Sequence, residues 1–421
     1  MLRERRVLFE MRLVGTALSD SVGIRRDHEN VHKEMLLYYI IINMRSPVQA
    51  AAELIDHAAG FVMNRAVLGI DIGTSSIRIV QLKTGTEKPV LETYGAIELG
   101  PYADMEKGET VKIDAHKNAT ALLDLLHEVK ASARVGGMSI PLSSTFIALI
   151  DSPSRNDEQM RRLIPTEAAP YIPAPLDSVT LDWQVIPEPE NESAFAYAEK
   201  KEAVSPHMQK LLLAAVRNEA LLGCQKITAN ADLSISFYEV EMFGAARSNT
   251  HRAGESGLLI DLGASTSKIY VLDEHGMTLG AHTAEYGGSS ITKHLMETFK
   301  WHFDDAEKAK RSEGLSNIRK QLGHAISEIM SKICDEAHRT VHAYNTDHAR
   351  KISYAVLMGG GARMPGIAEY TARQLGLDIS IATPFEHVRG PMILEDVLRD
   401  VGPLYAVATG LALRGLHRNR H

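Results

Sequence analysis

Two aspartates of this chain follow apolar runs and stand directly before glycine-containing turns, Asp71 in IDIGTSSIR and Asp261 in IDLGASTSK. A phosphate oxygen can approach the backbone N–H groups of small residues closely, and hydroxyl side chains can add donors. Such residues are Gly73, Thr74, Ser75 and Ser76 in the first turn, and Gly263, Ala264, Ser265 and Thr266 in the second. Since a carboxylate repels phosphate, each aspartate is interpreted as holding a hydrated Mg²⁺ that bridges the phosphates. Either turn alone is better explained as an ordinary tight turn, whereas the pair favours a two-sided site for phosphate and magnesium.

A third glycine turn, Gly359-Gly360-Gly361-Ala362-Arg363, comes after an apolar run and before a helical pattern. Without side chains, its backbone could lie against a nucleoside, so this turn is predicted to form the adenosine side of the same site. The alternative is a flexible connection between a strand and a helix. Gly287 and Gly288 come after the second aspartate turn and are predicted to line the phosphates or the ribose. Alternatively, these two glycines only terminate a strand.

The elements that must position the aspartates are the segments 66–82 and 257–272, each an apolar run, a small polar turn and a second strand-like run. In the first segment, the run after the turn has apolar residues on a period of about two, at Ile77, Ile79 and Leu82. This pattern predicts two β-hairpins. The order of strand, Asp, Gly, small polar turn and strand occurs in both segments. Such an internal repeat predicts two homologous halves that face each other.

The rest of the chain is predicted to supply the surrounding helices and strands. Asp114 is the expected N-cap of a helix over 115–130. A strand-like run at 138–151 leads into a stretch rich in proline, which predicts a small inserted subdomain at 146–208, with a hairpin loop at 187–203. Further predictions are a strand at 211–216, a helix from Asn218, a strand at 234–243, mostly helices over 290–350, a strand and a helix flanking the third glycine turn, and a closing helix at 405–414.

The order of these features resembles the superfamily of actin, heat-shock chaperones and sugar kinases, over residues 64–416. The resemblance implies an α/β, actin-like (ribonuclease H-like), two-lobed ATP-binding fold with a small inserted α+β subdomain. The implied parts are a first lobe of residues 64–145, 209–256 and 398–416, the subdomain at 146–208, and a second lobe of residues 257–397 with a helical insertion at about 290–350. Residues 1–63 precede them, either as an upstream extension before a true start at Met63 or as an amphipathic appendage.

The same resemblance implies roles for several charged residues. Glu241, in EVEMFGAAR, matches the acidic position near magnesium and the attacking water, and is the candidate catalytic residue. Arg78 matches a basic position of the first hairpin; the alternative is a solvated strand residue. Glu307, Lys310 and Arg311 resemble the helix that flanks the adenine, although a plain charged helix face would also explain them.

Within this superfamily, the segment YIPAPLDSVTLDWQVI resembles the inserted subdomain of the PilM family of type IV pilus assembly proteins. The cell-division protein FtsA has its insertion at the same place but lacks this sequence pattern. The PilM resemblance implies an ATP-binding scaffold on the cytoplasmic side of the inner membrane and at most a slow ATPase. Its implied partners are the cytoplasmic N-terminal peptide of a PilN-like protein, PilO-like and PilP-like components indirectly, and a second copy through self-association.

Composition excludes several other classes of protein. The 421 residues carry a formal net charge of -7 and two distant cysteines, which disfavours nucleic-acid binding, a disulfide framework and a zinc site. No apolar run reaches the roughly 20 residues of a membrane span, and no cleavable signal peptide is predicted. Three other functions are less consistent with the sequence. An FtsA-like membrane-associated filament would require a C-terminal amphipathic helix, and a secretion-system L protein would add a membrane span. A small-molecule kinase would require an acceptor motif, and none is found.

Overall fold

The structure is a computed structural model that describes residues 66–153, 157–186, 208–316 and 318–418. The predicted N-terminal extension and the whole predicted loop at 187–203 lie outside these residues. No helix of the described ranges is long and apolar enough to cross a membrane.

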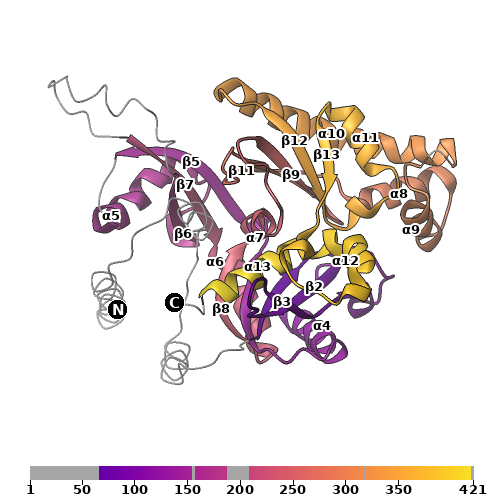
Figure 1. Ribbon diagram of the computed structural model, residues 1–421, viewed down its shortest axis with the longest axis horizontal. Coiled ribbons are helices and arrows are strands. Elements are labelled where there is room, and N and C mark those ends of the chain that lie inside the picture. Colours follow the sequence, from indigo (N-terminus) through magenta and orange to yellow (C-terminus); the bar gives the residue numbers. More distant parts are fainter. Residues whose placement is uncertain (1–65, 154–156, 187–207, 317, 419–421) are drawn as a thin grey trace. The chain divides into compact units, whose positions relative to one another are not determined.

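The first lobe is built on a sheet with the strand order β3-β2-β1-β4-β8. Figure 1 labels β2, β3 and β8 of this sheet. Its strands are β1 (Ala66–Ile72), β2 (Ser76–Lys83), β3 (Val90–Glu98), β4 (Val135–Ile140) and β8 (Ser234–Val240). Its helices are α4 (Ala115–Glu128), α6 (Asn218–Asn230), α7 (Glu241–Ser248), α12 (Glu395–Val401) and α13 (Ala406–Arg418). The Asp114 carboxylate accepts a hydrogen bond from the Lys117 N–H at the start of α4, which confirms the predicted N-cap.

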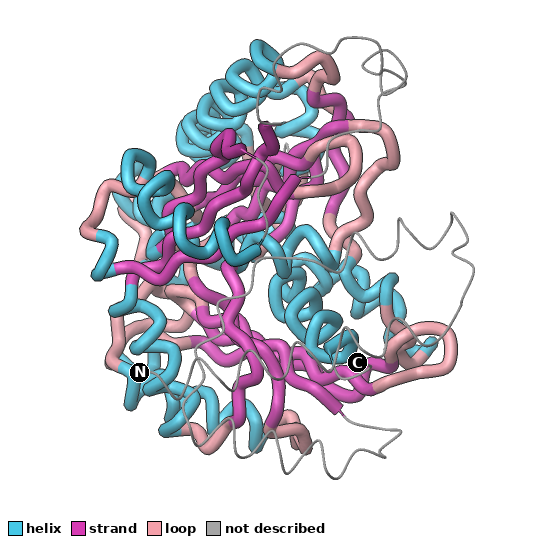
Figure 2. Tube along the Cα trace, turned by 90° about the vertical axis from the view of Figure 1, so that its left-hand side faces the viewer, coloured by secondary structure: helices cyan, strands magenta, loops and turns pink. Residues whose placement is uncertain are grey.

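Helices cover both faces of this sheet because β1 buries side chains in both directions. Val67 shares a core cluster with Ala412 of α13, whereas Leu68 shares another with Leu122 of α4. The period of two along a strand sends neighbouring side chains to opposite faces. The tube view shows the resulting arrangement of strands between helices (Figure 2).

The second lobe repeats the first, with the strand order β11-β10-β9-β12-β13. Its strands are β9 (Ser256–Leu262), β10 (Ser267–Leu272), β11 (Thr278–Ala284), β12 (Ile352–Met358) and β13 (Asp378–Ile381). Its helices are α8 (Gly288–Phe299), α9 (Phe303–Ser312), α10 (Lys320–Asp347) and α11 (Ile367–Leu375). In each lobe the first strand pairs antiparallel with the second and parallel with the fourth, so both predicted hairpins are present in equivalent places.

The inserted subdomain has a separate sheet, β5-β7-β6, and one helix. These elements are β5 (Thr145–Pro153), α5 (Asp157–Ala168), β6 (Val179–Ile186) and β7 (Met208–Arg217). By strand pairing, the subdomain extends to Arg217, and the predicted end at 208 was too early because β7 pairs with β5 and β6 along its length. The predicted single strand at 138–151 is also divided. A 3₁₀ turn at Leu142–Ser144, after Pro141, separates β4 from β5 and places them in different sheets.

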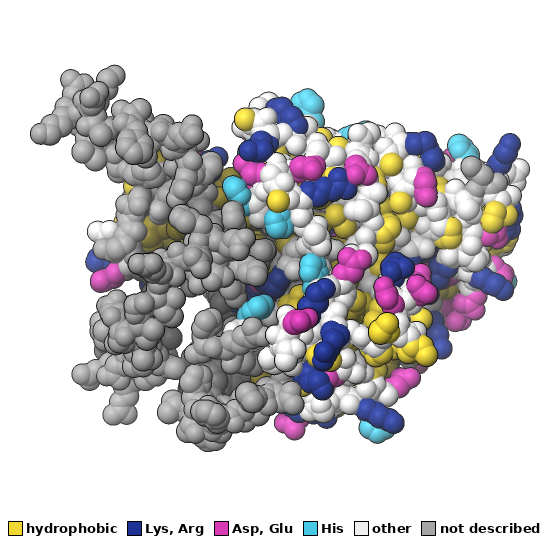
Figure 3. All heavy atoms as spheres, in the orientation of Figure 1, with side chains coloured by type: hydrophobic (Ala, Val, Ile, Leu, Met, Phe, Trp, Pro, Cys, Tyr) yellow, Lys and Arg dark blue, Asp and Glu magenta, His cyan; other side chains and the backbone are white. Residues whose placement is uncertain are grey.

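After the second lobe, the chain re-enters the first lobe at a lower residue number than the predicted boundary at 398. Arg389 bridges to Val90 of β3, and Phe385 and Val388 lie in the core cluster of β1, β2 and α13. Short 3₁₀ turns carry this return, and they have no periodic pattern that would mark it. On the face drawn in Figure 3, acidic and basic side chains are interspersed over both lobes, with hydrophobic atoms between them.

Candidate functional site

The first hairpin holds Asp71 in a fixed orientation at the end of β1. Its Oδ1 accepts a hydrogen bond from the Ser139 hydroxyl at 2.9 Å, and its Oδ2 lies 3.2 Å from Nη1 of Arg78. Arg78 is also the cross-strand partner of Asp71 in the β1–β2 pairing. Both carboxylate oxygens of Asp71 are therefore engaged, and Arg78 is part of the site instead of a solvated strand residue.

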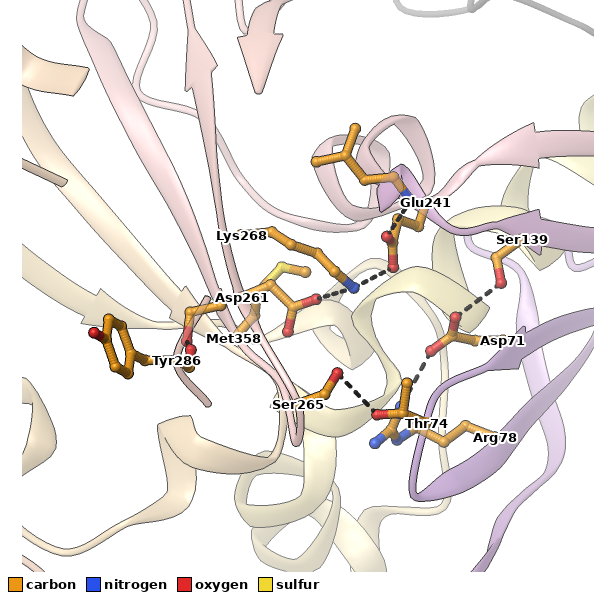
Figure 4. A network of polar contacts seen from close by, with 12 residues as sticks. Asp71, Thr74, Arg78, Ser139, Glu241, Asp261, Ser265, Lys268, Tyr286 and Met358 are labelled. Carbon is orange, nitrogen blue, oxygen red and sulfur yellow. Dashed lines mark hydrogen bonds and ion pairs between the residues drawn. The ribbon is translucent and has the colours of Figure 1, made fainter. Parts of the chain in front are cut away.

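The second hairpin brings Asp261 close to Glu241, which is the first residue of α7 in the other lobe (Figure 4). The link between them is Lys268, whose Nζ lies 2.7 Å from Oε2 of Glu241 and 3.8 Å from Oδ2 of Asp261. The other oxygen of Glu241 accepts a hydrogen bond from the Leu142 N–H at 2.6 Å. A carboxylate from each lobe therefore meets one ammonium group.

Burial governs the ionisation of this group. It raises the pKa of Glu241 and that of Asp261, although Lys268 acts in the opposite direction on both. Burial alone would lower the pKa of Lys268, but Glu241 and Asp261 raise it above its ordinary value. Lys268 is therefore positively charged at neutral pH, and it compensates carboxylates that are costly to keep ionised away from water.

The tips of the two hairpins face each other. The Thr74 hydroxyl donates to Oγ of Ser265 at 3.2 Å, which joins the first turn to the second (Figure 4). The second turn is supported from behind, because the Gly263 carbonyl accepts from the Gly288 N–H at 2.9 Å. A Cβ atom on Gly287 would lie 2.6 Å from the Ala264 carbonyl oxygen, so only glycine allows this close packing. Gly287 and Gly288 thus shape the turn at the start of α8.

Two neighbouring cavities open at these turns. We call the first the acidic cavity; it measures about 320 Å³ and is lined by Asp71, Glu241, Asp261, Lys268 and both turns. We call the second the glycine cavity; it measures about 380 Å³ and is lined by Gly287, Gly288, Glu307, Lys310, Arg311, Gly360, Gly361 and Arg363. Ser75, Arg78, Gly263, Ala264 and Gly360 line both. Both cavities therefore receive residues from both lobes.

The charged residues of α9 form an internal network at the glycine cavity. Lys310 Nζ donates to Oε2 of Glu307 at 2.6 Å, to the Thr292 hydroxyl at 2.7 Å and to the Gly288 carbonyl at 3.0 Å. Burial lowers the pKa of Lys310. Burial would raise the pKa of Glu307, but Lys310, Thr292 and Arg311 together hold it below its usual value. Glu307 and Lys310 are thus a buried ion pair, which differs from the solvated helix face that was the alternative. Arg311 is exposed at the rim of the cavity and pairs with Glu307 at 2.7 Å.

The third glycine turn packs tightly against the end of β9. Gly359 has φ +83, and a Cβ atom there would lie 2.3 Å from Oδ1 of Asp261. A Cβ atom on Gly361 would lie 2.7 Å from that of Leu262, whereas one on Gly360 would meet nothing within 4 Å. Gly360 therefore presents open backbone to both cavities. Arg363 reaches outward to Asp400, with its Nη2 2.6 Å from Oδ2.

The arrangement suits a nucleotide better than it suits the predicted metal. Two adjoining cavities with small, donor-rich turns match a phosphate chain next to a nucleoside. The aspartates predicted to hold Mg²⁺ already have cationic partners, Arg78 for Asp71 and Lys268 for Asp261. Among the described residues, no cluster of three or more His, Cys, Asp or Glu side chains is arranged to hold a metal ion. Direct contact of both aspartates with a metal would require these partners to move, and the hydrated Mg²⁺ stays a prediction.

Sequence reasoning identified Arg78 but missed Lys268. The signal was present in the internal repeat: aligning DIGTSSIR with DLGASTSK places Lys268 on Arg78, seven positions after each aspartate. The structure shows the same equivalence, because Asp71 pairs with Arg78 and Asp261 with Lys268 across their hairpins. Ser139, which fixes Asp71, had no such signal because it lies on a distant strand.

Comparison with known proteins agrees with the fold. The family model of type IV pilus assembly protein PilM matches residues 69–416. A chain of the "PilM-PilN type IV pilus biogenesis complex" is similar over 83% of this chain and 98% of its own length, at 23% identity and a TM-score of 0.69. The ethanolamine utilization protein EutJ from Carboxydothermus hydrogenoformans is similar over 84% of this chain and 91% of its own, at 15% identity and a TM-score of 0.50. The fold is the two-lobed actin-like fold, as predicted. Since the family model spans most of its length, the chain belongs to the PilM family of type IV pilus assembly proteins.

Proposed function

We propose that this protein is a nucleotide-binding scaffold of type IV pilus assembly, with ATP as the nucleotide. The observation that carries the proposal is the pair of adjoining cavities between the lobes, each lined by turns from both. A ligand that contacts both lobes favours the relative position in which both sets of contacts are made. ATP would thus act as a conformational ligand, and the residues predicted to bind it are those that line the two cavities.

Hydrolysis is proposed to be slow at most. Glu241 is the candidate that would orient an attacking water. One of its oxygens accepts from the Leu142 N–H and the other pairs with Lys268. The Lys268 ammonium group acts to lower the pKa of Glu241 and so weakens it as a general base. Magnesium is not part of this proposal, because Arg78 already pairs with Asp71, and Lys268 is shared between Asp261 and Glu241.

The proposed partner is the cytoplasmic N-terminal peptide of a PilN-like inner-membrane protein, with PilO-like and PilP-like components joined indirectly. Two things support it: family membership, and the similarity to a chain of a PilM–PilN complex. The inserted subdomain also exposes apolar side chains that a peptide could cover, among them Tyr171 at 52% and Val185 at 44%. Through this partner the protein would be held at the cytoplasmic face of the inner membrane; self-association remains a separate prediction.

Nucleotide binding is tested by filling the cavities. Gly360→Leu places a side chain where nothing lies within 4 Å of the new Cβ, at a residue that lines both cavities. We expect ATP affinity, measured by isothermal titration calorimetry, to fall by about tenfold or more because a filled cavity excludes its ligand. Gly223→Leu on α6, whose Cβ also meets nothing within 4 Å, is the matched control and retains affinity. Equal affinity of both variants would contradict nucleotide binding at this site.

Partner binding is tested by capture of a synthetic peptide with the N-terminal sequence of the PilN-like protein, with and without ATP. We expect capture by the wild-type protein and weaker capture by Tyr171→Ala. Met392→Ala serves as control, since Met392 is 90% exposed on the first lobe, outside the inserted subdomain. Failure of the wild-type protein to bind the peptide in either nucleotide state would overturn the scaffold proposal.

A further inference from the structure

Lys268 is held at a fixed point of the acidic cavity. It lies on β10, which pairs on both sides, with Asp261 of β9 and with Thr283 of β11 as its neighbours across the strands. Only 18% of its side chain is exposed, and its Nζ is aimed between Glu241 and Asp261 (Figure 4). The sheet fixes the backbone and two carboxylates fix the ammonium group. This cation is therefore a permanent part of the cavity.

Cationic side chains of the protein already stand beside the carboxylates of the acidic cavity. Three carboxylates line it, those of Asp71, Glu241 and Asp261, and so do three cations, Arg78, Lys112 and Lys268. Arg78 pairs with Asp71 inside the first hairpin, whereas Lys268 spans Glu241 and Asp261 between the lobes. In many nucleotide sites a divalent metal bridges carboxylates and phosphate oxygens and neutralises their charge. Here an ammonium group stands between the carboxylates that such a metal would share.

We propose that Lys268 is a built-in cation that takes the charge-balancing role of a divalent metal, so that this protein binds nucleoside triphosphates without requiring Mg²⁺. The proposal rests on the nucleotide-binding function proposed above. An ammonium group offers three donors and a full positive charge but no coordination sites. Mg²⁺ instead demands near-octahedral oxygen ligands and gives up its waters reluctantly. Lys268 already places one positive charge beside Glu241 and Asp261, at the point a bridging metal would occupy, and phosphate oxygens would meet a cation that belongs to the protein.

The test compares ATP affinity in excess MgCl₂ with that in EDTA, by isothermal titration calorimetry on the full chain. We expect the wild-type affinity to change by less than about threefold between the two buffers, since metal and nucleotide are then scarcely coupled. Lys268→Met removes the cation, so we expect its affinity to depend on Mg²⁺ by about tenfold or more. Lys293→Met loses the same charge from a side chain that is 78% exposed, and it behaves like the wild type.

Each outcome decides the proposal. A wild-type affinity that drops tenfold or more in EDTA would overturn it and leave nucleotide binding intact. Independence of Mg²⁺ in both the wild type and Lys268→Met would show that Lys268 is not the cation responsible. No ATP binding in either buffer would refute the proposed nucleotide site together with this inference. The wild-type comparison needs no variant, so it remains decisive if Lys268→Met does not fold.

Discussion

Gly359→Ala tests whether the third glycine turn is a built part of the site or a flexible connection. Gly359 has φ +83 and ψ -178, a backbone conformation that is open almost only to glycine. Backbone strain should therefore lower the unfolding free energy of the alanine variant by about 2 kcal/mol. The new methyl would also lie 2.3 Å from Oδ1 of Asp261 and 2.9 Å from the Leu262 carbonyl oxygen. Overpacking of this kind adds about 2 kcal/mol. The total expected loss of unfolding free energy is thus about 4 kcal/mol.

The assay is urea unfolding of the full chain, followed by far-UV circular dichroism. With an m value of about 4 kcal/mol/M, the midpoint should move down by about 1 M. Gly360→Ala is the control, because its Cβ would meet nothing within 4 Å and alanine restricts the unfolded chain. We expect Gly360→Ala to stay within about 0.5 kcal/mol of the wild type. If the two variants unfolded at the same urea concentration, the turn would be a flexible connection and our account of its packing would fail.

Two further variants test the core between α7 and α13. Burial would raise the pKa of Glu239, but Arg247 and Arg414 hold it below the usual carboxyl value. The ionised Glu239 therefore stabilises the fold fully at pH values above the unfolded-state pKa, and this stabilisation is lost as the pH falls through the folded-state pKa. Glu239→Gln should therefore lower the free energy of unfolding by about 3–5 kcal/mol at neutral pH. The difference in unfolding free energy between variant and wild type should become smaller below about pH 4, and a difference that stays constant down to pH 3 would contradict this. Gly410→Ala would place a methyl 1.8 Å from the Gly244 carbonyl oxygen and should cost about 3 kcal/mol or more in thermal or urea unfolding. Its control is Gly415→Ala on the same helix, where the nearest atom lies 3.4 Å away; equal stability of the two would argue against close contact of the helices.

The hairpins and the third glycine turn could be predicted because their signals are local. Alternation on a period of two, a small-residue turn and a capping aspartate are each contained in a few consecutive residues. Which sheet a strand joins is not a local property. The run LLLAAV predicted a strand correctly, but its pairing with β5 and β6 placed it in the inserted subdomain.

The candidate site shows the same division. The turn residues could be named from their types and order, and Arg78 from its place in the first hairpin. The contact of Lys268 with Glu241 joins residues from different lobes, and no spacing in the sequence announces it. The bonds of Glu307 with Lys310 and Thr292 likewise depend on how α8 and α9 cross.

The position of α13 against β1 has a consequence for how the chain is made. The second lobe is one continuous stretch, from β9 at Ser256 to β13 at Ile381. The first lobe is discontinuous, since Val67 near the start of β1 packs with Ala412 of α13. Domains fold as units while they emerge from the ribosome. The second lobe can therefore complete its core first, whereas β1, β2 and β3, although synthesised earlier, must wait for α13 to cover them.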